Sequence, residues 1–294
     1  MPTAERLAAE FEQHRAHLRA VAYRMLGSTT EADDAVQESW IRLGRTDVSG
    51  IENLRAWLTT VVARVCLDML RVRAARPEDP LDTHVPDPVI TRPDEDPESN
   101  AIRVDSVGLA LLVVLETLEP AERLALVLHD VFGMTFDEIA PIVDRSAVAA
   151  RQLASRARRR VQGRTPLSAD ADVHNQRRVV DAFLAAAERG DFEALLAVLD
   201  PAIVLRADGG AIKGMSRYVR GAQGVASQAA TFSQIGLSIQ VVLVNGNIGL
   251  VCRLPDGHLF SVIGFTIARG KIVEMDILAD PERLSRLDLS AIEH

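Results

Sequence analysis

The first part of the chain places apolar residues at the spacing of an α-helix. Leu7, Phe11, His14, Leu18 and Val21 recur every three or four residues, so they share one face of a helix. Gly27 follows as a residue that commonly ends helices. The pattern therefore predicts an amphipathic helix that ends near Gly27.

Two more amphipathic helices are predicted before residue 76. In STTEADDAVQESWIRL, Thr30 is a candidate N-cap, and Asp33 stands three residues later in a position like that of a capping box. The run NLRAWLTTVVARVCLDMLRVR carries a continuous apolar stripe at helical spacing. Residues 1–76 are thus expected to form a helical domain.

Residues 77–99 break this pattern. They contain six prolines, eight acidic residues and one arginine. Proline removes backbone hydrogen-bond donors and the acidic side chains repel one another, so this segment cannot fold alone. It is predicted to be an extended, acidic interdomain linker.

Helical periodicity returns over residues 100–163. The run VGLALLVVLETL is apolar on nearly every side, which predicts a buried core helix. Two shorter helices should follow, with Thr135 capping the first and Ser146 capping the second. Pro141 lies inside the first of them and should kink or shorten it, because proline deletes one helical hydrogen bond.

The pattern of hydrophobic residues changes again over residues 172–294. Two helices are predicted before residue 200, and five apolar runs follow them. These runs are AIVLRA, LSIQVVLV, IGLVCRL, HLFSVIGFTIA and KIVEMDIL, with turns expected at NGN, PDG and ARG. Helices followed by a strand meander predict an α+β domain. The expected fold is multidomain, with two all-α domains followed by this α+β domain.

Charge and composition narrow the possible functions. The chain has a formal net charge of −8, yet residues 145–164 carry seven arginines and no acid. Cys66 and Cys252 are the chain's two cysteines, too few for a zinc site or a disulfide framework. No apolar run approaches the roughly 18 residues that a membrane span needs, and the charged N-terminus is unlike a signal peptide. A cytoplasmic protein without a metal, a cofactor or a membrane partner is expected.

The arginine-rich segment is predicted to be a helix with two distinct faces. Its small and apolar residues share one face: Ala150, Leu153, Ala154, Ala157 and Val161. The opposite face and its flanks carry Val148, Arg151, Gln152, Ser155, Arg156 and Arg159. A helix, a tight turn and a second helix of this kind form a helix-turn-helix, whose second helix enters the major groove of DNA. The alternative is an ordinary solvated basic helix.

Two segments before this motif, EADDAVQESWIRL and NLRAWLTTVVARVCLDMLR, resemble those of the extracytoplasmic-function sigma factors in order and spacing. The resemblance covers residues 5–163, with region two over 1–76 and region four over 100–163. It implies a transcription initiation factor that binds promoter DNA and core RNA polymerase, through the β′ clamp helices and the β flap. The residues that match the polymerase-docking segment are Asp33, Asp34, Val36, Gln37, Glu38 and Trp40. Asp33 and Asp34 could equally serve only to stabilise a helix N-terminus.

The same resemblance assigns the DNA contacts. The loop over residues 44–52 and the helix after it match the element that opens and reads the −10 promoter element. The contacts expected there are Arg55, Thr60, Arg64 and Arg71, while Trp57 is expected in the core. The contacts expected with the −35 element are Ser146, Val148, Arg151, Gln152, Ser155, Arg156 and Arg159.

Residues 172–294 resemble the SnoaL-like α+β cone, which one subgroup of these sigma factors carries as a fused domain. Three short runs look like markers of that subgroup: VPDPV (85–89), DGGAIKG (208–214) and ADPERL (279–284). The resemblance implies that the cone regulates the factor in cis. The expected interdomain contacts are Asp87, Asp208, Gly209, Gly210, Lys213, Asp280, Pro281 and Leu284, with Lys213 pairing with linker acids such as Asp87.

Relatives of the cone include enzymes that use Asp and His as acid and base. The candidates here are Asp208, His258, Glu274 and Asp276. His258 is expected at a solvated hairpin tip and Asp276 inside the cone, and a single acid is not a mechanism. A docking module with no catalytic residue is therefore expected. The alternatives are a DNA-targeted SnoaL-type enzyme, a sensor with a small ligand in the cone, and a stand-alone helix-turn-helix repressor.

Overall fold

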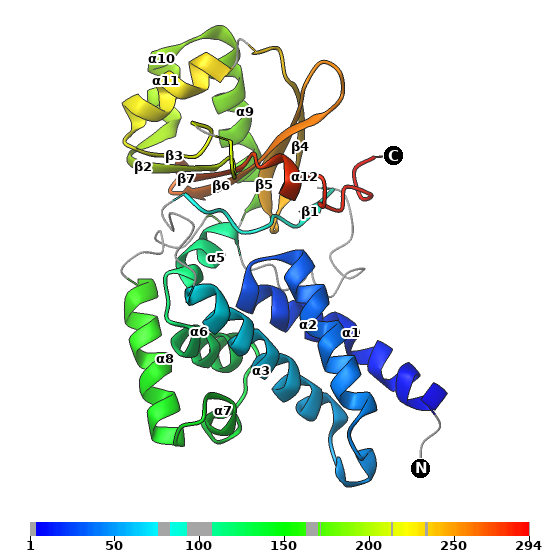
Figure 1. The fold of residues 1–294 in the computed structure, drawn as a ribbon. Helices are drawn as coiled ribbons and strands as arrows, with labels where there is room; N and C mark the ends of the chain where they lie inside the picture. Colours follow the sequence, from blue (N-terminus) through cyan, green and yellow to red (C-terminus); the bar gives the residue numbers. More distant parts are fainter. Residues whose placement is uncertain are drawn as a thin grey trace. The chain divides into compact units, whose positions relative to one another are not determined.

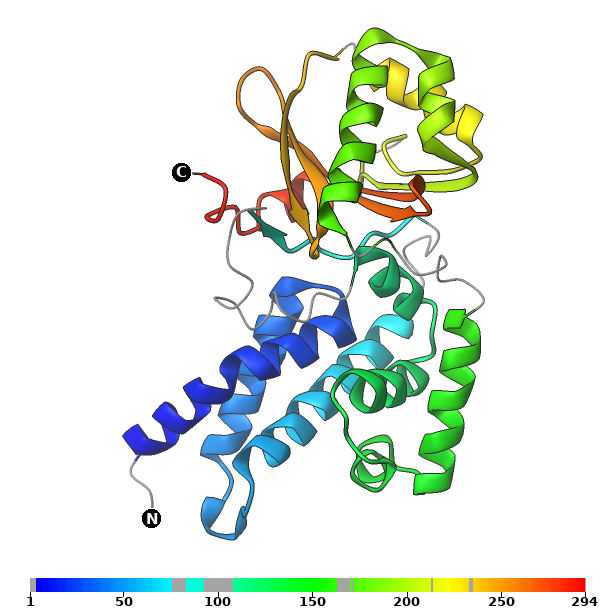
Figure 2. The ribbon, with the colours of Figure 1, turned by 180° about the vertical axis from the view of Figure 1, so that it is seen from behind.

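The computed structural model describes residues 4–75, 83–92, 108–162, 170, 172–212, 214–232 and 235–293. These residues form two compact units (Figures 1 and 2). The helical unit comprises residues 4–75 and 114–162, and the C-terminal unit comprises residues 83–92, 108–113 and those from 170 onwards. None of the described helices is long and apolar enough to cross a lipid bilayer.

The N-terminal helices of the helical unit are those predicted from the sequence. They are α1 (Ala4–Leu26), α2 (Thr29–Gly44) and α3 (Leu54–Ala74), each in contact with the other two, with a short 3₁₀ turn η1 (Val48–Gly50) between α2 and α3. Phe11, Leu18 and Leu58 are buried in their shared core, as the apolar periodicity requires.

The cap of α2 differs from the expectation. Ser28, not Thr30, caps the helix, and its Oγ accepts a hydrogen bond from the backbone N–H of Glu31 at 3.4 Å. Thr30 already lies inside the first turn, where its side chain cannot serve as an N-cap. Asn53 caps α3 in the same way, since its Oδ1 accepts from the N–H of Ala56 at 3.0 Å.

The second set of helices forms the predicted helix-turn-helix. It consists of α5 (Leu109–Glu116), α6 (Pro120–Leu126), the π-helical turn η3 (Val127–Val131), α7 (Phe136–Val143) and α8 (Ala147–Gln162). Thr135 and Glu138 form the capping box of α7, and the Oγ of Ser146 accepts from the N–H of Ala149 at 3.2 Å. Pro141 leaves α7 only eight residues long. Asp144, with a left-handed φ of 55°, turns the chain into α8.

A buried arginine joins the two sets of helices. Arg123 of α6 is 2% exposed, and its Nη2 donates to the carbonyl oxygen of Arg24, near the C-terminus of α1, at 3.3 Å. Arg73 donates to the carbonyl of Leu26 at 3.0 Å. Cations suit the negative end of a helix dipole, and these carbonyls have no partner within α1. Burial lowers the pKa of Arg123 to about 10, so its side chain stays charged at neutral pH.

The C-terminal unit is built on one curved mixed sheet. Among the described residues the strand order is β1-β4-β5-β6-β7-β2-β3, antiparallel throughout except for the parallel pair β2 and β7. The strands are β1 (Ile90–Thr91), β2 (Leu199–Asp208), β3 (Arg217–Arg220), β4 (Ser238–Val244), β5 (Asn247–Arg253), β6 (Leu259–Ala268) and β7 (Lys271–Leu278). The predicted α+β class and the predicted meander are confirmed.

Helices cover one face of this sheet (Figure 1). They are α9 (Val173–Arg189), α10 (Phe192–Val198) and α11 (Ala222–Phe232), while the short α12 (Pro281–Leu284) follows β7. The sequence pattern predicted α9 and α10 but missed α11 and β3. It also missed β1, because a proline-rich acidic run does not have the composition of a strand.

Alternate residues of the central strands face opposite sides of the sheet. Leu205 and Met275 lie in the core beneath the helices, whereas their neighbours Arg206 and Asp276 lie on the other face. There the guanidinium of Arg206 pairs with the carboxylate of Asp276 at 3.0 Å. The sheet thus has an apolar face under the helices and an opposite face that carries buried polar side chains.

Arg123→Ala should lower the free energy of unfolding of the helical unit by about 2–4 kcal/mol, because it leaves a cavity and a buried carbonyl without its donor. Urea unfolding monitored by tryptophan fluorescence measures the stability of this unit, since the chain's two tryptophans, Trp40 and Trp57, both lie in it. The control is Arg64→Ala, an exposed arginine with one hydrogen bond, which should cost about 0–1 kcal/mol. Equal losses for the two variants would contradict the assignment of Arg123.

Candidate functional site

The acidic face of α2 is the surface expected to dock on polymerase. It consists of Asp33, Asp34, Gln37 and Glu38, all exposed or half-buried. Asp33 pairs with Arg19 at 2.7 Å, and Glu38 pairs with Arg42 at 2.9 Å. Ile41 is 38% exposed and follows on the same face, because residues three, four and seven positions apart coincide on a helix. The face is therefore acidic with an apolar residue at its end.

Val36 and Trp40 were also expected on this surface, but the structure buries Val36 and leaves Trp40 half-buried at the edge, three residues after Gln37. Val36 is 1% exposed and packs in the helical core. The ring of Trp40 is half-buried, with its centroid 5.0 Å from that of Phe11 on α1. These side chains hold α2 against the core, because the helical period turns them away from Asp34 and Glu38.

The residues expected to contact the −10 element lie on two faces of α3. Thr60, Arg64 and Arg71 share one side, which we call the −10 face; both arginines are exposed and Thr60 is half-buried. Arg55 lies on a different side, where its Nη2 is 3.3 Å from Nδ1 of His17 on α1. Trp57 is half-buried. The structure does not gather all four expected contacts on one surface.

The −10 face touches the helix-turn-helix. The guanidinium of Arg64 donates to the carbonyl oxygen of Pro141 in α7 at 3.1 Å. Beside it, the ring of His17 meets Phe132 edge-on at 5.5 Å, and the guanidinium of Arg24 lies 4.9 Å from the same ring. We call these contacts, together with Arg123, the helical seam. The seam occupies part of the surface expected to read DNA.

His17 sits in the seam as a neutral imidazole. Burial, reinforced by the charge of Arg55, lowers its pKa to about 4. Its Nε2 lies 3.1 Å from the hydroxyl of Thr59. A protonated ring here would face two arginines, Arg24 and Arg55, so the seam favours the uncharged form.

The outer face of α8 is arranged as the sequence predicted. Val148 is 67% exposed, and the side chains of Arg151, Gln152, Ser155 and Arg159 are also exposed. Ala150, Ala154 and Ala157 are fully buried against the rest of the helical unit. The guanidinium of Arg151 lies 5.3 Å from the ring centroid of Phe136, and Ser146 serves as the helix cap. A helix with an exposed Gln and Arg face can enter a major groove.

Other arginines of α8 pair with acidic residues of the same unit while their side chains stay partly exposed. Buried Glu122 of α6 pairs with Arg156 at 2.9 Å and with Arg160 at 2.6 Å. Asp130 accepts from Nε of Arg158 at 2.7 Å. Arg156, an expected DNA contact, is exposed and also ties α8 to α6. The positive charge of the helix therefore serves packing as well as its outer surface.

Part of the acidic linker is packed onto the C-terminal sheet. Val85 is fully buried, and Ile90 and Thr91 form β1 beside β4. The N–H of Val89 donates to Oδ1 of Asn245 at 3.0 Å, and the N–H of Asn245 donates to the carbonyl of Val89 at 2.8 Å. Residues 83–92 are extended, and Val85 contacts Asp208 at the start of the DGG loop, where the sequence led us to expect the linker to pack. Their prolines keep the chain extended while the residues between them donate and pack.

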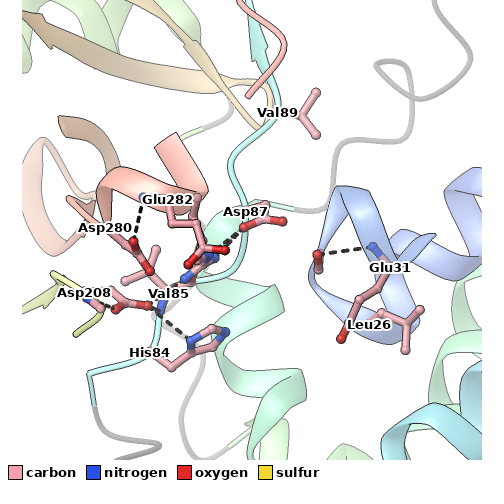
Figure 3. A network of polar contacts seen from close by, with 12 residues as sticks. Leu26, Glu31, His84, Val85, Asp87, Val89, Asp208, Asp280 and Glu282 are labelled. Atoms are coloured by element: carbon pink, nitrogen blue, oxygen red, sulfur yellow. Dashed lines mark hydrogen bonds and ion pairs between the residues drawn. The ribbon is translucent and has the colours of Figure 1, made fainter. Parts of the chain in front are cut away.

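Asp208, at the end of β2, is the centre of this attachment (Figure 3). Its carboxylate accepts from the N–H of Val85 at 3.2 Å and from Nη1 of Arg283 at 2.7 Å, and it lies 3.2 Å from Nδ1 of His84. Burial alone would raise the pKa of Asp208, but the hydrogen bonds and the charge of Arg283 outweigh it and lower the pKa to about 2. The carboxylate is therefore ionised throughout the neutral range.

Arg283 of α12 binds the same linker segment, at residues 85–87. Its Nε donates to Oδ1 of Asp87 at 2.9 Å, and its Nη2 donates to the carbonyl of Val85 at 2.6 Å. Asp280 caps α12 by accepting from the N–H of Glu282 at 2.9 Å, as Figure 3 shows. Pro281 occupies the first turn of α12 and Leu284 is buried. We call Asp208, Arg283, Asp87, His84 and the backbone of Val85 the linker network.

The two glycines after Asp208 let α12 approach. A Cβ on Gly210, which has a φ of 57°, would lie 2.3 Å from Oδ2 of Asp280. A Cβ on Gly209 would lie 2.1 Å from Cβ of Met215. These positions require glycine for close packing rather than for exposed flexibility.

The partner expected for Asp87 was Lys213, which lies outside the described residues. In the structure the carboxylate of Asp87 forms an ion pair with Arg283, a residue that sequence reasoning did not single out. His84 and Asn245 were missed as well. The sequence did hold a signal for Arg283, because it lies within the ADPERL run, three residues after Asp280, one of the expected interdomain contacts.

The four candidate acid–base residues do not converge on one site. His258 is exposed beside Asp256 at 3.1 Å, which confirms its predicted place at a hairpin tip. The expectation that Asp276 faces into the cone is wrong, because the strand period puts it, buried, on the face opposite the helices with Arg206. Glu274 lies next to them, and burial together with the charge of Asp276 raises its pKa to about 7. Among the described residues these groups form no catalytic pair.

Comparison with family models identifies both helical parts of the chain. The model of sigma-70 region 2 matches residues 11–76, and the model of sigma-70 region 4 matches residues 108–161. The first match covers α2 and α3, and the second covers the helix-turn-helix.

Curated relatives and a solved structure match nearly the whole chain. The ECF RNA polymerase sigma factor SigJ of Mycobacterium tuberculosis is 37% identical, over 94% of this chain and 93% of its own length. A probable ECF RNA polymerase sigma factor of that species, SigI, is 34% identical over 96% of both chains. The crystal structure of Mycobacterium tuberculosis SigJ covers 96% of this chain and 99% of that chain, with a TM-score of 0.74 and 33% identity. The chain therefore belongs to the extracytoplasmic-function family of RNA polymerase sigma factors.

Proposed function

We propose that the C-terminal unit of this sigma factor regulates it in cis by holding the linker between regions two and four. The observation that carries the proposal is the linker network, in which Asp208 and Arg283 grip residues 84–87. A sigma factor directs core polymerase to promoters, and its two regions address separate promoter elements. The linker sets how far those regions can separate. A domain that binds the linker therefore controls their reach.

The helical seam explains why this control restrains the factor. Arg64, on the −10 face, donates a hydrogen bond to the carbonyl of Pro141 within the helix-turn-helix. Reading both promoter elements requires the −10 face of α3 and the outer face of α8 to be free together. A captured linker favours the closed seam, since it reduces the chain entropy gained when the regions separate. Release of the linker should therefore activate transcription.

The faces of α2, α8 and α3 each bind a different partner. The acidic face of α2 binds core polymerase at the β′ clamp helices, where its charge complements a basic partner. The outer face of α8 reads the −35 element, with Gln152 and Arg151 placed for base edges and Arg159 for phosphate. Thr60, Arg64 and Arg71 serve the −10 element after the seam opens. Polymerase binding by region four at the β flap completes the arrangement in the cytoplasm.

We assign no enzymatic activity to the cone. An acid–base mechanism needs two groups within reach of one substrate. Glu274 and Asp276 pair with Arg206 on the sheet face opposite the helices, Asp208 binds the linker, and His258 is exposed at a hairpin. This separation favours a regulatory domain over a DNA-targeted enzyme.

Arg283→Ala should raise run-off transcription by core polymerase. Losing about 1 kcal/mol of preference for the captured linker would shift the closed and open populations roughly fivefold. Arg286→Ala is the matched control, because Arg286 follows α12 and, among the described residues, its side chain pairs with exposed Glu282 rather than with the linker. Equal activity of Arg283→Ala, Arg286→Ala and the unaltered factor would refute regulation through the linker.

Gln152→Ala should weaken promoter binding by about 1–3 kcal/mol and relax specificity within the −35 element, because an amide reading a base edge would be lost. Arg159→Ala should weaken all sequences alike and reduce the slope of affinity against salt by about one phosphate contact. Fluorescence anisotropy with matched and mismatched promoter fragments separates the two effects. A uniform loss for Gln152→Ala would show that this side chain contacts only the DNA backbone.

Asp34→Arg should abolish co-purification with core polymerase while leaving the fold intact, because Asp34 is exposed on the acidic face. Glu12→Arg is the control, since it reverses an exposed acid on α1, outside that face. Circular dichroism checks that both variants are folded. Retained polymerase binding by folded Asp34→Arg would place the docking surface elsewhere.

A further inference from the structure

The C-terminal unit contains a cavity that the linker network does not use. It has a volume of about 540 Å³ and lies between the helix face of the sheet and helices α9 and α11. Packed protein interiors rarely hold voids larger than a water molecule. Sites for small-molecule ligands typically measure roughly 300–1,000 Å³. The size of the cavity fits a bound molecule better than a packing defect.

The wall of the cavity is almost entirely apolar. Phe183 of α9, Val225 of α11 and Leu205, Leu250 and Met275 of the sheet supply most of its depth. Ile239 also lines it and is 47% exposed, which leaves an apolar side chain in contact with water. A contiguous apolar surface that reaches the exterior favours an apolar occupant.

Polar groups occur at three places in the lining. Ser261 and Cys252 face each other across β5 and β6, and both are buried. Gln228 of α11 is half-buried, while Glu188 and Arg217 are exposed and so lie at the mouth. Burial raises the pKa of the Cys252 thiol to about 11, which leaves it protonated and a poor nucleophile. The lining therefore offers a hydroxyl and an amide for hydrogen bonding and no buried charge to neutralise an ion.

We infer that this cavity binds an uncharged, largely apolar small molecule that places one hydroxyl or carbonyl group near Ser261. An ionised group inside would lose its hydration without gaining a partner, because the charged lining residues Glu188 and Arg217 stay at the exposed mouth. A cavity enclosed by a sheet and two helices suits a compact molecule rather than an extended peptide.

The cavity and the linker network share a wall. Ala279 lines the cavity, and its N–H donates to the carbonyl of Asp208 at 2.7 Å. Ala207 also lines the cavity and immediately precedes Asp208, while Met215 packs directly against Gly209. A ligand that pushes on this wall therefore acts on the residues that hold the linker. This second step rests on the proposed function, whereas binding itself does not.

The test uses N-phenyl-1-naphthylamine, an uncharged aromatic probe, with the full-length protein and without polymerase. We expect saturable fluorescence enhancement at one site per chain and a rise in the melting temperature of the C-terminal unit, because ligands stabilise the state that binds them. The same skeleton bearing a sulfonate, 8-anilinonaphthalene-1-sulfonate, should bind much more weakly. Equal binding of the two probes would overturn the assignment of an uncharged ligand.

Filling the cavity supplies the matched variants. Ala229→Phe on α11 and Leu184→Trp on α9 should each weaken probe binding by roughly tenfold or more, since the new ring occupies the site. Gln223→Phe adds the same ring to the exposed side of α11 and should bind the probe normally. Two filling variants on different helices guard against one of them failing to fold. Unchanged binding by a folded filling variant would overturn the site.

Amide hydrogen exchange at Val85 and Val89 separates the site from its coupling. Their N–H groups are bonded to Asp208 and Asn245, so exchange reports whether the linker is held. We expect the probe to change these rates in the unaltered chain but not in Ala229→Phe. Saturable binding with no change at either amide would uphold the site and overturn its link to the linker. The transcription of Arg283→Ala tests linker regulation independently of any ligand.

Discussion

The ion pair between Asp208 and Arg283 is the interaction on which the C-terminal architecture depends. One carboxylate at the end of β2 and one guanidinium on α12 hold a segment that lies more than a hundred residues earlier in the chain. Both groups are largely buried, and each has a second partner: Asp87 for Arg283, and the N–H of Val85 for Asp208. Gly210 is needed because a side chain there would meet Asp280, the cap of α12, and Gly209 is needed because a side chain there would meet Met215.

Arginines in the helical unit divide between packing and exposed surfaces. Arg123 is buried against a helix C-terminus, and Arg156 and Arg160 share buried Glu122. Gln152 and Arg159 remain exposed on the outer face of α8. A chain of net negative charge can therefore present a basic helix to DNA while the same helix is anchored by ion pairs on its flanks.

Periodicity predicted the helices and the strand meander because those elements bury one face each, and burial imposes a repeat on the sequence. It could not predict β1, since the strand character of Ile90 and Thr91 depends on pairing with β4 rather than on local composition. The resemblance led to Asp87 and Asp208, but the partner that joins them, Arg283, became visible only when distant segments met. Val36 was misplaced because a matching motif does not say which side of a helix each residue occupies.

Because successive residues of a strand point to opposite faces, one face of the sheet lines the cavity and the other carries polar side chains. Along β7, Met275 and Ile277 line the apolar cavity, while Glu274 and Asp276 between them face the opposite side. The same alternation on β2 puts Ala207 in the cavity and Asp208 in the linker network. Successive residues of a strand share backbone geometry, so a shift that accommodates a molecule on one face moves the neighbouring side chains on the other. The alternation thus supplies a physical route for the proposed coupling between the cavity and the linker.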